Sequence, residues 1–208
     1  GSTFKKTYYD ETLGRAVSRF VPAENLVVPY ETSDLETCPN ITQVVRMSLN
    51  DLRKRQIYGT YLDVEVIPAQ KEMSSLDGEM DRIEGLEPNQ IDYDCTILEV
   101  HADLDLEGYE ELDDEGEPTG IKVPYIVTIS EDNGQVLSVR RNYLEEDELK
   151  KKIQYFTHFK FLPGFGFYGL GLIHTIGGLS RTATAALRQL IDAGTLSNLP
   201  AGFKARGL

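Results

Sequence analysis

The chain is poor in the residues that build disulfides, metal sites and catalytic centres. Its 208 residues include no tryptophan, two cysteines (Cys38 and Cys95) and three histidines (His101, His158 and His174). The cysteines form no metal-binding spacing, and so few thiols are typical of a reducing compartment. The histidines are dispersed, and the sequence holds no HExxH, GxSxG or Walker A motif. We therefore expect no metal site, no cofactor and no catalytic residues.

Long apolar runs are also missing. No stretch of about 18 apolar residues occurs, so we expect no membrane-spanning helix, and residues 1–20 lack the apolar segment of a signal peptide. Gly1 and Ser2 resemble the remnant of a cleaved tag, the first residue is not methionine, and the chain stops abruptly at Leu208. We therefore expect the sequence to be a piece of a longer protein.

Basic residues are outnumbered by acids. The chain has 34 acids against 21 lysines and arginines, a formal net charge of -13. This excess argues against a surface that grips phosphates and favours one that repels nucleic acid. The acids are densest over 103–117, where no base occurs: Asp103, Asp105, Glu107, Glu110, Glu111, Asp113, Asp114, Glu115 and Glu117.

This acidic segment has the spacing of a calcium loop, but only in part. Asp103, Asp105, Glu107 and Asp114 occupy ligand positions of a twelve-residue loop. However, a strand precedes the segment, Glu110 stands where an apolar residue is expected, and Asp114 replaces the usual bidentate glutamate. A solvated acidic loop, or an acidic surface that faces a pore, is therefore favoured over a calcium-binding module.

Most of the chain has the alternating pattern of short strands, which predicts an α+β fold with antiparallel hairpins. Asn133-Gly134 between two alternating runs is the strongest hairpin signal, and Pro124 suggests a free edge on the first of these strands. Ser48 is placed to cap a short helix that Gly59 can close. The predicted strands cover residues 4–9, 16–21, 26–28, 41–47, 61–67, 95–106, 121–129, 135–143 and 155–162, and a short charged helix is predicted over 144–152.

The last fifth of the chain predicts a strand, a glycine-rich turn and a long helix that ends at Gly194. One helix face is apolar, and small residues beside it allow close approach of another element. Because nothing that follows is long enough to cover this helix, we expect it to contact another subunit or the rest of the protein. The predicted contact residues are Leu179, Thr182, Ala183, Ala186, Leu187 and Leu190.

The glycine-rich turn contains a literal GxGxxG, Gly164 to Gly169, between a predicted strand and a helix. This context is the one that supports dinucleotide binding, so a nucleotide-binding enzyme is the alternative interpretation. Against it, no further strand follows at crossover distance, and Asp192, at about the right spacing for a ribose ligand, ends a helix. Three bulky aromatics also crowd the turn, so we expect Phe165, Phe167 and Tyr168 to pack into a core or an interface.

Three long strings resemble portal proteins of short-tailed double-stranded DNA phages. They are Phe20–Val66, YIVTISEDNGQVLSVRRNY (Tyr125–Tyr143) and Phe159–Leu208, which begins FKFLPGFGFYGLGLIHTIGG. They occur in the same order and cover most of the chain.

The resemblance implies a structural subunit of a ring, commonly of twelve copies, at one capsid vertex. Duplex DNA passes non-specifically through the ring during packaging and ejection, while the terminase supplies the ATPase and the portal is not an enzyme. Terminase, capsid and tail adaptor proteins would be the partners. The protein would assemble in the host cytoplasm and reside in the virion, without membrane contact.

In that plan the chain divides into three parts. Residues 3–60 form a wing-like or stem-like segment of strands and a helix, residues 61–162 a β-rich clip-like unit, and residues 163–208 a stem-like or channel-type helix after the glycine turn. The acids at Asp103, Asp105, Glu107, Glu110, Glu111, Asp113 and Asp114 would face the channel or the motor. An acidic channel wall lowers the friction on sliding DNA by repulsion.

Overall fold

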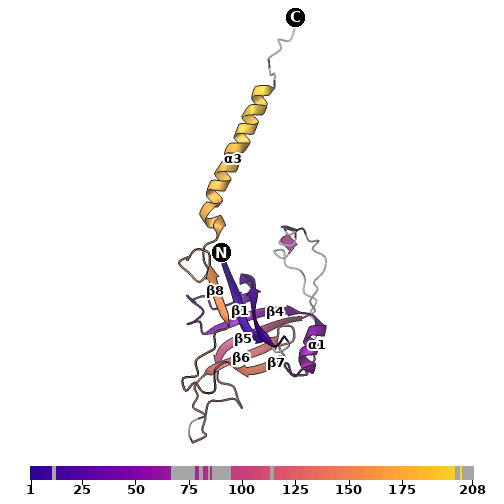
Figure 1. Ribbon diagram of the computed structural model, residues 1–208, viewed down its shortest axis with the longest axis vertical. Helices are drawn as coiled ribbons and strands as arrows, with labels where there is room; N and C mark the ends of the chain where they lie inside the picture. The colour runs from indigo at the N-terminus through magenta and orange to yellow at the C-terminus, as the bar shows by residue number, and fades with distance from the viewer. Residues whose placement is uncertain are drawn as a thin grey trace. The chain divides into compact units, whose positions relative to one another are not determined.

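The computed structural model describes residues 1–10, 13–66, 78–79, 82–83, 85, 95–112, 115–199 and 202. These residues form an α+β fold with antiparallel sheets of three and five strands and a C-terminal helix, as expected (Figure 1). The chain divides into two compact units. The sheet unit comprises Thr3–His158, and the helix unit comprises Gly1–Ser2 with Phe159–Leu208.

The larger sheet has the strand order β3-β4-β5-β6-β7, and all neighbours in it are antiparallel. The predicted hairpin is confirmed, since β6 and β7 flank Gly134, whose φ of 68° is the left-handed conformation that glycine allows. The strands are β3 (Leu26–Val27), β4 (Asn40–Met47), β5 (Cys95–Leu104), β6 (Val123–Ser130) and β7 (Val136–Arg141).

The free edge that Pro124 suggested is wrong, because β6 lies between β5 and β7. Pro124 is the second residue of its strand, opposite Asp103 on β5, and the pairing with β7 starts only at Tyr125. The proline carbonyl still accepts a hydrogen bond from the Asn142 amide. A proline is therefore tolerated here because it stands where the ladder begins.

Apolar clusters cover both faces of the larger sheet. Cross-strand partners share a face, so Ile97 lies opposite Ser130 on one side and Leu104 opposite Val123 on the other. The first cluster consists of Met47, Leu52, Tyr61, Val66, Cys95, Ile97 and Leu137. The second consists of Val123, Tyr125 and Val127, with Leu104, Leu106, Ile129, Val139 and Tyr143 packed against it.

Helix α1 (Leu49–Ile57) contributes Leu52 to the first cluster. Its start is confirmed, because the Ser48 hydroxyl accepts a hydrogen bond from the Asp51 amide at 3.2 Å. Its end is confirmed too, since Gly59 has a φ of 74°. The predicted strand after it is wrong, because residues 62–66 have no strand conformation, although the Leu62 amide donates to the Leu137 carbonyl on β7 at 2.7 Å. The amide of buried Gln56 instead binds the carbonyls of Leu62 and Val64, which a neighbouring strand would otherwise use.

The predicted helix over 144–152 is also wrong, because this segment contains two turns, at 145–146 and 148–149, and no helix. The Asp147 carboxylate accepts hydrogen bonds from the amides of Leu149 and Lys151, at 3.1 Å each. Such local bonds from an aspartate compete with helical backbone pairing. Lys150 follows with a φ of 45°, which a helix does not contain.

The smaller sheet has the order β2-β1-β8 and is built on a hairpin. Gly14, with a φ of 62°, lies in the connection between its first two strands. Fully buried Phe4 stacks on the His158 ring at a centroid distance of 4.4 Å. The strands are β1 (Ser2–Asp10), β2 (Arg15–Val21) and β8 (Phe156–Lys160), and a short 3-10 helix η1 (Ala23–Asn25) follows β2.

Helix α3 spans Leu172–Asn198 and has 27 residues, which corresponds to about 40 Å at 1.5 Å per residue. The predicted end at Gly194 is wrong, since the helix continues through this glycine. Leu199, the C-cap, has extended backbone with a ψ of 118°. Pro200 follows it in the sequence, and a residue before proline is disfavoured in helical conformation, so the proline sets the end.

Candidate functional site

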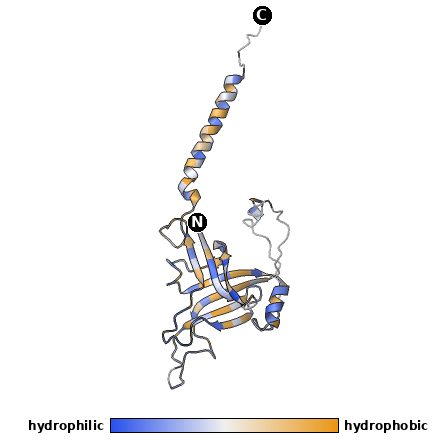
Figure 2. Ribbon diagram, in the orientation of Figure 1, coloured by the Kyte–Doolittle hydropathy of each residue, from blue (hydrophilic) through white to orange (hydrophobic). Residues whose placement is uncertain are grey.

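The most exposed element of the helix unit is α3, in which no residue is buried. At 100° per residue, Leu172, Ile176, Leu179, Ala183 and Leu190 fall on one face of the helix. Arg181, Arg188 and Asp192 fall on the opposite face. Figure 2 shows apolar and polar segments alternating along α3. The helix therefore carries an apolar stripe that nothing in the described part of its own unit covers.

The predicted contact residues lie on or beside this stripe. Leu179, Leu187 and Leu190 are 74, 61 and 73% exposed, respectively, and Ala183 and Ala186 stand between them. Thr182 differs, because its hydroxyl donates to the carbonyl of Gly178 at 3.0 Å within the same helix. It thus acts as a small spacer, and its hydroxyl is already engaged in the helix.

Energetics explain why this helix needs a partner. Gly177, Gly178 and Gly194 each cost about 1 kcal/mol relative to alanine within a helix. Helices in proteins owe most of their stability to the packing of an apolar face against another element. Burying one leucine or isoleucine contributes about 1.5–3 kcal/mol, so a contact along the stripe supplies enough free energy to fix the helix.

The glycine-rich turn is a closed loop ahead of the helix. Leu162 and Leu170 form an isolated antiparallel bridge, with the Leu170 amide 2.8 Å from the Leu162 carbonyl. A Cβ on Gly169 would lie 2.7 Å from that carbonyl oxygen, and one on Gly164 would lie 3.0 Å from the Tyr168 oxygen. These two glycines are thus required by close backbone approach.

The same loop lacks the geometry of a dinucleotide cradle. The helix begins only after Gly171, so all three motif glycines precede its first turn, whose amides would bind a pyrophosphate. The Gly169 amide already donates to the Ser2 hydroxyl at 2.7 Å. The expected aromatic packing is met by Phe167, which is 7% exposed, but Phe165 points fully outward.

The acidic segment begins on β5 and continues into the following loop. Asp103 belongs to the strand, and Asp105 and Glu107 follow it with exposed side chains. Glu110 accepts a hydrogen bond from the Gly108 amide at 2.8 Å, and such backbone bonds lower the pKa of its carboxyl. Glu111 is paired with Lys150. The last two predicted residues, Asp113 and Asp114, lie outside the described residues.

The acids of this segment are presented unevenly. Asp103, Asp105 and Glu107 are exposed, whereas Glu110 bonds within the loop and Glu111 pairs with Lys150 outside it. In the described part of the chain, no three His, Cys, Asp or Glu side chains are close enough to share a metal ion. What the segment offers is a negatively charged surface.

A buried charge cluster joins the two sheets, and the sequence reasoning missed it. The Lys6 ammonium on β1 lies 2.5 Å from Glu99 Oε1 on β5, and His101 Nε2 lies 2.7 Å from the same oxygen. All three side chains are at most 13% exposed. Lys6 also lies 5.5 Å from the ring centroid of Phe156. The available signal was a glutamate and a histidine two residues apart in a largely apolar strand.

The pKa values of this cluster follow from burial and pairing. Burial alone raises the pKa of Glu99, but the hydrogen bond from His101 and the charge of Lys6 outweigh it and hold this pKa at about 2. Burial lowers the pKa of His101 and that of Lys6. A cavity of about 10 Å³ beside His101 has room for about one water molecule and none for a substrate. The cluster is thus an internal joint between the sheets.

The comparisons with known proteins identify no family for this chain. No protein-family model matches the chain, and a search of curated proteins finds no match to it. Among the described residues, no helix has the length and apolar character needed to cross a bilayer.

Proposed function

We propose that the chain is part of a structural subunit of a phage portal ring, through which double-stranded DNA enters and leaves the capsid. The observation that carries the proposal is the apolar stripe on α3, a long helix that buries no residue. Such a stripe needs a neighbouring subunit or a further part of the same subunit. In this assignment α3 is a stem or channel element.

Two further features support the proposal. The net charge of -13, with Asp103, Asp105 and Glu107 exposed, suits a wall along which DNA slides without strong phosphate contacts. Residues 61–162, most of which belong to the Thr3–His158 unit, would be the clip-like part that binds terminase and tail adaptor proteins. The ring would contain about twelve copies, as the resemblance to portal proteins implies, and would belong to the virion at the capsid vertex.

Electron microscopy of the full-length protein tests this function. The expected result is a closed ring with a central channel as wide as duplex DNA. A monomer, or a ring without such a channel, contradicts the proposal.

Thermal-shift measurements with NAD, FAD and ATP address the alternative, a nucleotide-binding enzyme that uses Gly164–Gly169. We expect no stabilisation by any of the three compounds, because the loop is closed and one of its amides is already engaged. A clear rise in melting temperature with one nucleotide, lost in a Gly169→Ala variant, would favour the enzyme instead.

A further inference from the structure

The β1–β2 hairpin presents an uncovered edge strand. β2 lies at the end of its sheet, so its outer backbone edge has no pairing strand in the described part of the chain. Of its seven residues, only Val21 is buried and Val17 half-buried. A strand edge of this length is a template for pairing with another chain unless something covers it.

The side chains along this edge are basic and apolar. By the pairing register, Arg15 and Arg19 project to the same face as Tyr8, while Phe20 projects to the opposite face with Tyr9. Phe20 is 62% exposed, and Tyr9 is 64% exposed. No acid occurs between Leu13 and Val21, although Asp10 at the end of β1 pairs with Arg19 at 3.2 Å. The hairpin is thus a positive, partly apolar arm on a chain whose net charge is strongly negative.

A second surface of the same unit has the opposite character. Residues 22–39, which surround edge strand β3, contain four acids and no base. Tyr30 is fully exposed, and Val27 on β3 is 54% exposed. Glu31 and Glu36 are exposed as well. We call residues 24–36 the acidic edge.

The acidic edge is held in shape before any partner arrives. Asp34 accepts hydrogen bonds from the amides of Glu36 and Thr37, at 2.9 and 2.8 Å, and from the hydroxyls of Ser33 and Thr37. Leu35 and Cys38 accept further bonds from the Lys152 ammonium. A pre-ordered loop loses little conformational entropy on binding.

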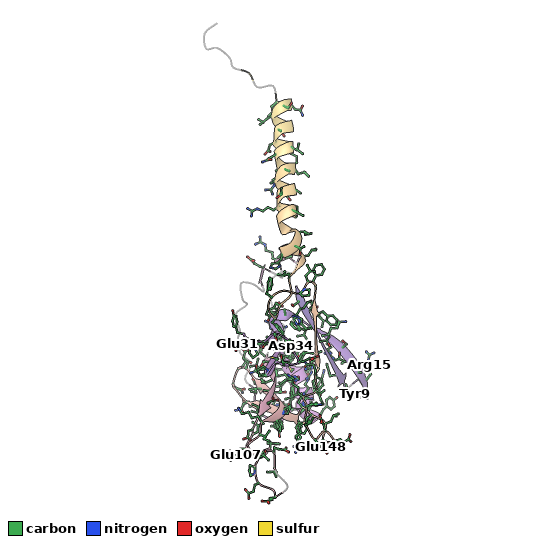
Figure 3. All side chains as sticks on the ribbon, turned by 90° about the vertical axis from the view of Figure 1, so that its left-hand side faces the viewer. Tyr9, Arg15, Glu31, Asp34, Glu107 and Glu148 are labelled. Atoms are coloured by element: carbon green, nitrogen blue, oxygen red, sulfur yellow. The ribbon has the colours of Figure 1, made fainter. Side chains whose placement is uncertain are left out.

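The two surfaces lie on different sides of the sheet unit. Figure 3 shows Arg15 and Tyr9 on one side and Glu31 on the other. One copy therefore cannot bring its own hairpin against its own acidic edge. Two complementary surfaces at different places on one molecule produce heterologous, head-to-tail contacts, which close into rings when the rotation between copies allows it.

We propose that the β1–β2 hairpin of one copy docks on the acidic edge of the next copy of this chain. Arg15, on one face of the hairpin, then meets Glu31 and Glu36, while Phe20 and Tyr9, on the other face, cover Val27 and Tyr30. This inference rests on the proposed ring function and specifies which surfaces of neighbouring subunits meet. It is independent of the stripe on α3, since both surfaces belong to the sheet unit.

Charge reversal tests the contact in the 208-residue chain by sedimentation velocity over a range of concentrations. The hairpin variant is Arg15→Glu with Phe20→Glu, and the edge variant is Glu31→Lys with Glu36→Lys. We expect the wild type to self-associate and each variant alone to need at least tenfold higher concentration. An equimolar mixture of the two variants should associate again, because reversed hairpins then face reversed edges.

The matched control is Lys54→Glu with Lys122→Glu, which reverses two exposed bases elsewhere on the sheet unit and should associate like the wild type. Circular dichroism checks that all variants are folded. A wild type that stays monomeric, variants that associate normally, or a mixture that fails to recover would overturn the proposed contact. A control that loses association equally would also overturn it, because net charge alone would then explain the loss.

Electron microscopy of the same samples separates this inference from the function. An assembly that is sensitive to these substitutions but has no DNA-wide channel supports the contact and contradicts the portal. A ring with such a channel that forms equally well in the wild type and in the variants supports the portal function and overturns the contact.

Discussion

Glu99 holds two hydrogen-bonding partners on a single oxygen: Oε1 lies 2.5 Å from the Lys6 ammonium and 2.7 Å from His101 Nε2. Lys6 belongs to the three-stranded sheet and Glu99 to the five-stranded sheet. The carboxylate is therefore the electrostatic link between the two layers of the sheet unit. Its removal leaves a buried ammonium without its counter-charge.

The first prediction concerns Glu99→Gln. We expect a loss of about 3–5 kcal/mol in the free energy of unfolding, because breaking one side of a buried ion pair strands the other charge. Urea unfolding followed by circular dichroism measures it. The double variant Lys6→Met with Glu99→Leu is the control and should lose less than the single variant. Equal losses would show that packing, and not charge, dominates at this joint.

The second prediction concerns acid stability. The pKa of Glu99 is depressed from 4.5 to about 2 on folding, so its contribution of about 3 kcal/mol is present above pH 4.5 and is lost as pH falls toward 2. The lowered pKa of His101 acts in the same direction below about pH 6.5, since the unfolded chain binds its proton more readily. The unfolding free energy measured from pH 7 to pH 2 should fall first below about pH 6.5, through His101, and then further below pH 4.5, through Glu99.

In Glu99→Gln the acid part of that profile should flatten, because the substituted side chain no longer titrates. Lys6 and Arg140 are the positive charges that act on His101. A wild-type profile that stays level between pH 4.5 and pH 2 would contradict the depressed pKa.

The third prediction concerns the stripe on α3. Leu187→Asp should weaken self-association by about ten- to a hundredfold, because it replaces 1.5–3 kcal/mol of apolar burial with a charge. Gln189→Asp, on the polar side of the same helix, introduces the same charge and should have little effect. Sedimentation equilibrium of both variants compares them. An equal effect of the two substitutions would argue that the stripe is not the contact.

The fourth prediction concerns the glycine loop. Gly169→Ala places a Cβ 2.7 Å from the Leu162 carbonyl oxygen and should cost about 1–3 kcal/mol through forced backbone displacement. Gly166→Ala meets no atom within 4 Å and should be tolerated. Hydrogen exchange at the Leu170 amide, which closes the loop, measures the local opening free energy. Slow exchange in both variants would contradict the steric argument.

Much of the fold could be predicted, because the sequence patterns of its turns, caps and strands match the structure that the rest of the chain imposes on them. The Asn133-Gly134 turn, the Ser48 cap and the alternation in β4 and β5 each depend on neighbours in sequence. Residues 62–66 could not be predicted, because the side chain of Gln56 takes the carbonyls that a strand would offer. The turns after Leu144 depend likewise on one carboxylate, that of Asp147.

The candidate surfaces were only partly predictable, for a related reason. Helical periodicity identifies the stripe on α3 from sequence alone. The joint at Glu99 requires a lysine 93 positions away, and the opposed hairpin and acidic edge require the two sides of a folded unit. Pairings of distant residues leave no periodic signal in the chain.

The bare helix α3 has a consequence for how the protein matures. In the proposed ring, formation of α3 would be thermodynamically coupled to assembly, because this helix buries no residue within its own unit. Newly made subunits would therefore carry a frayed tail, open to trypsin at Arg181 and Arg188, while assembled subunits would resist cleavage. Protease resistance of these two bonds thus reports the fraction of subunits that have found their neighbours.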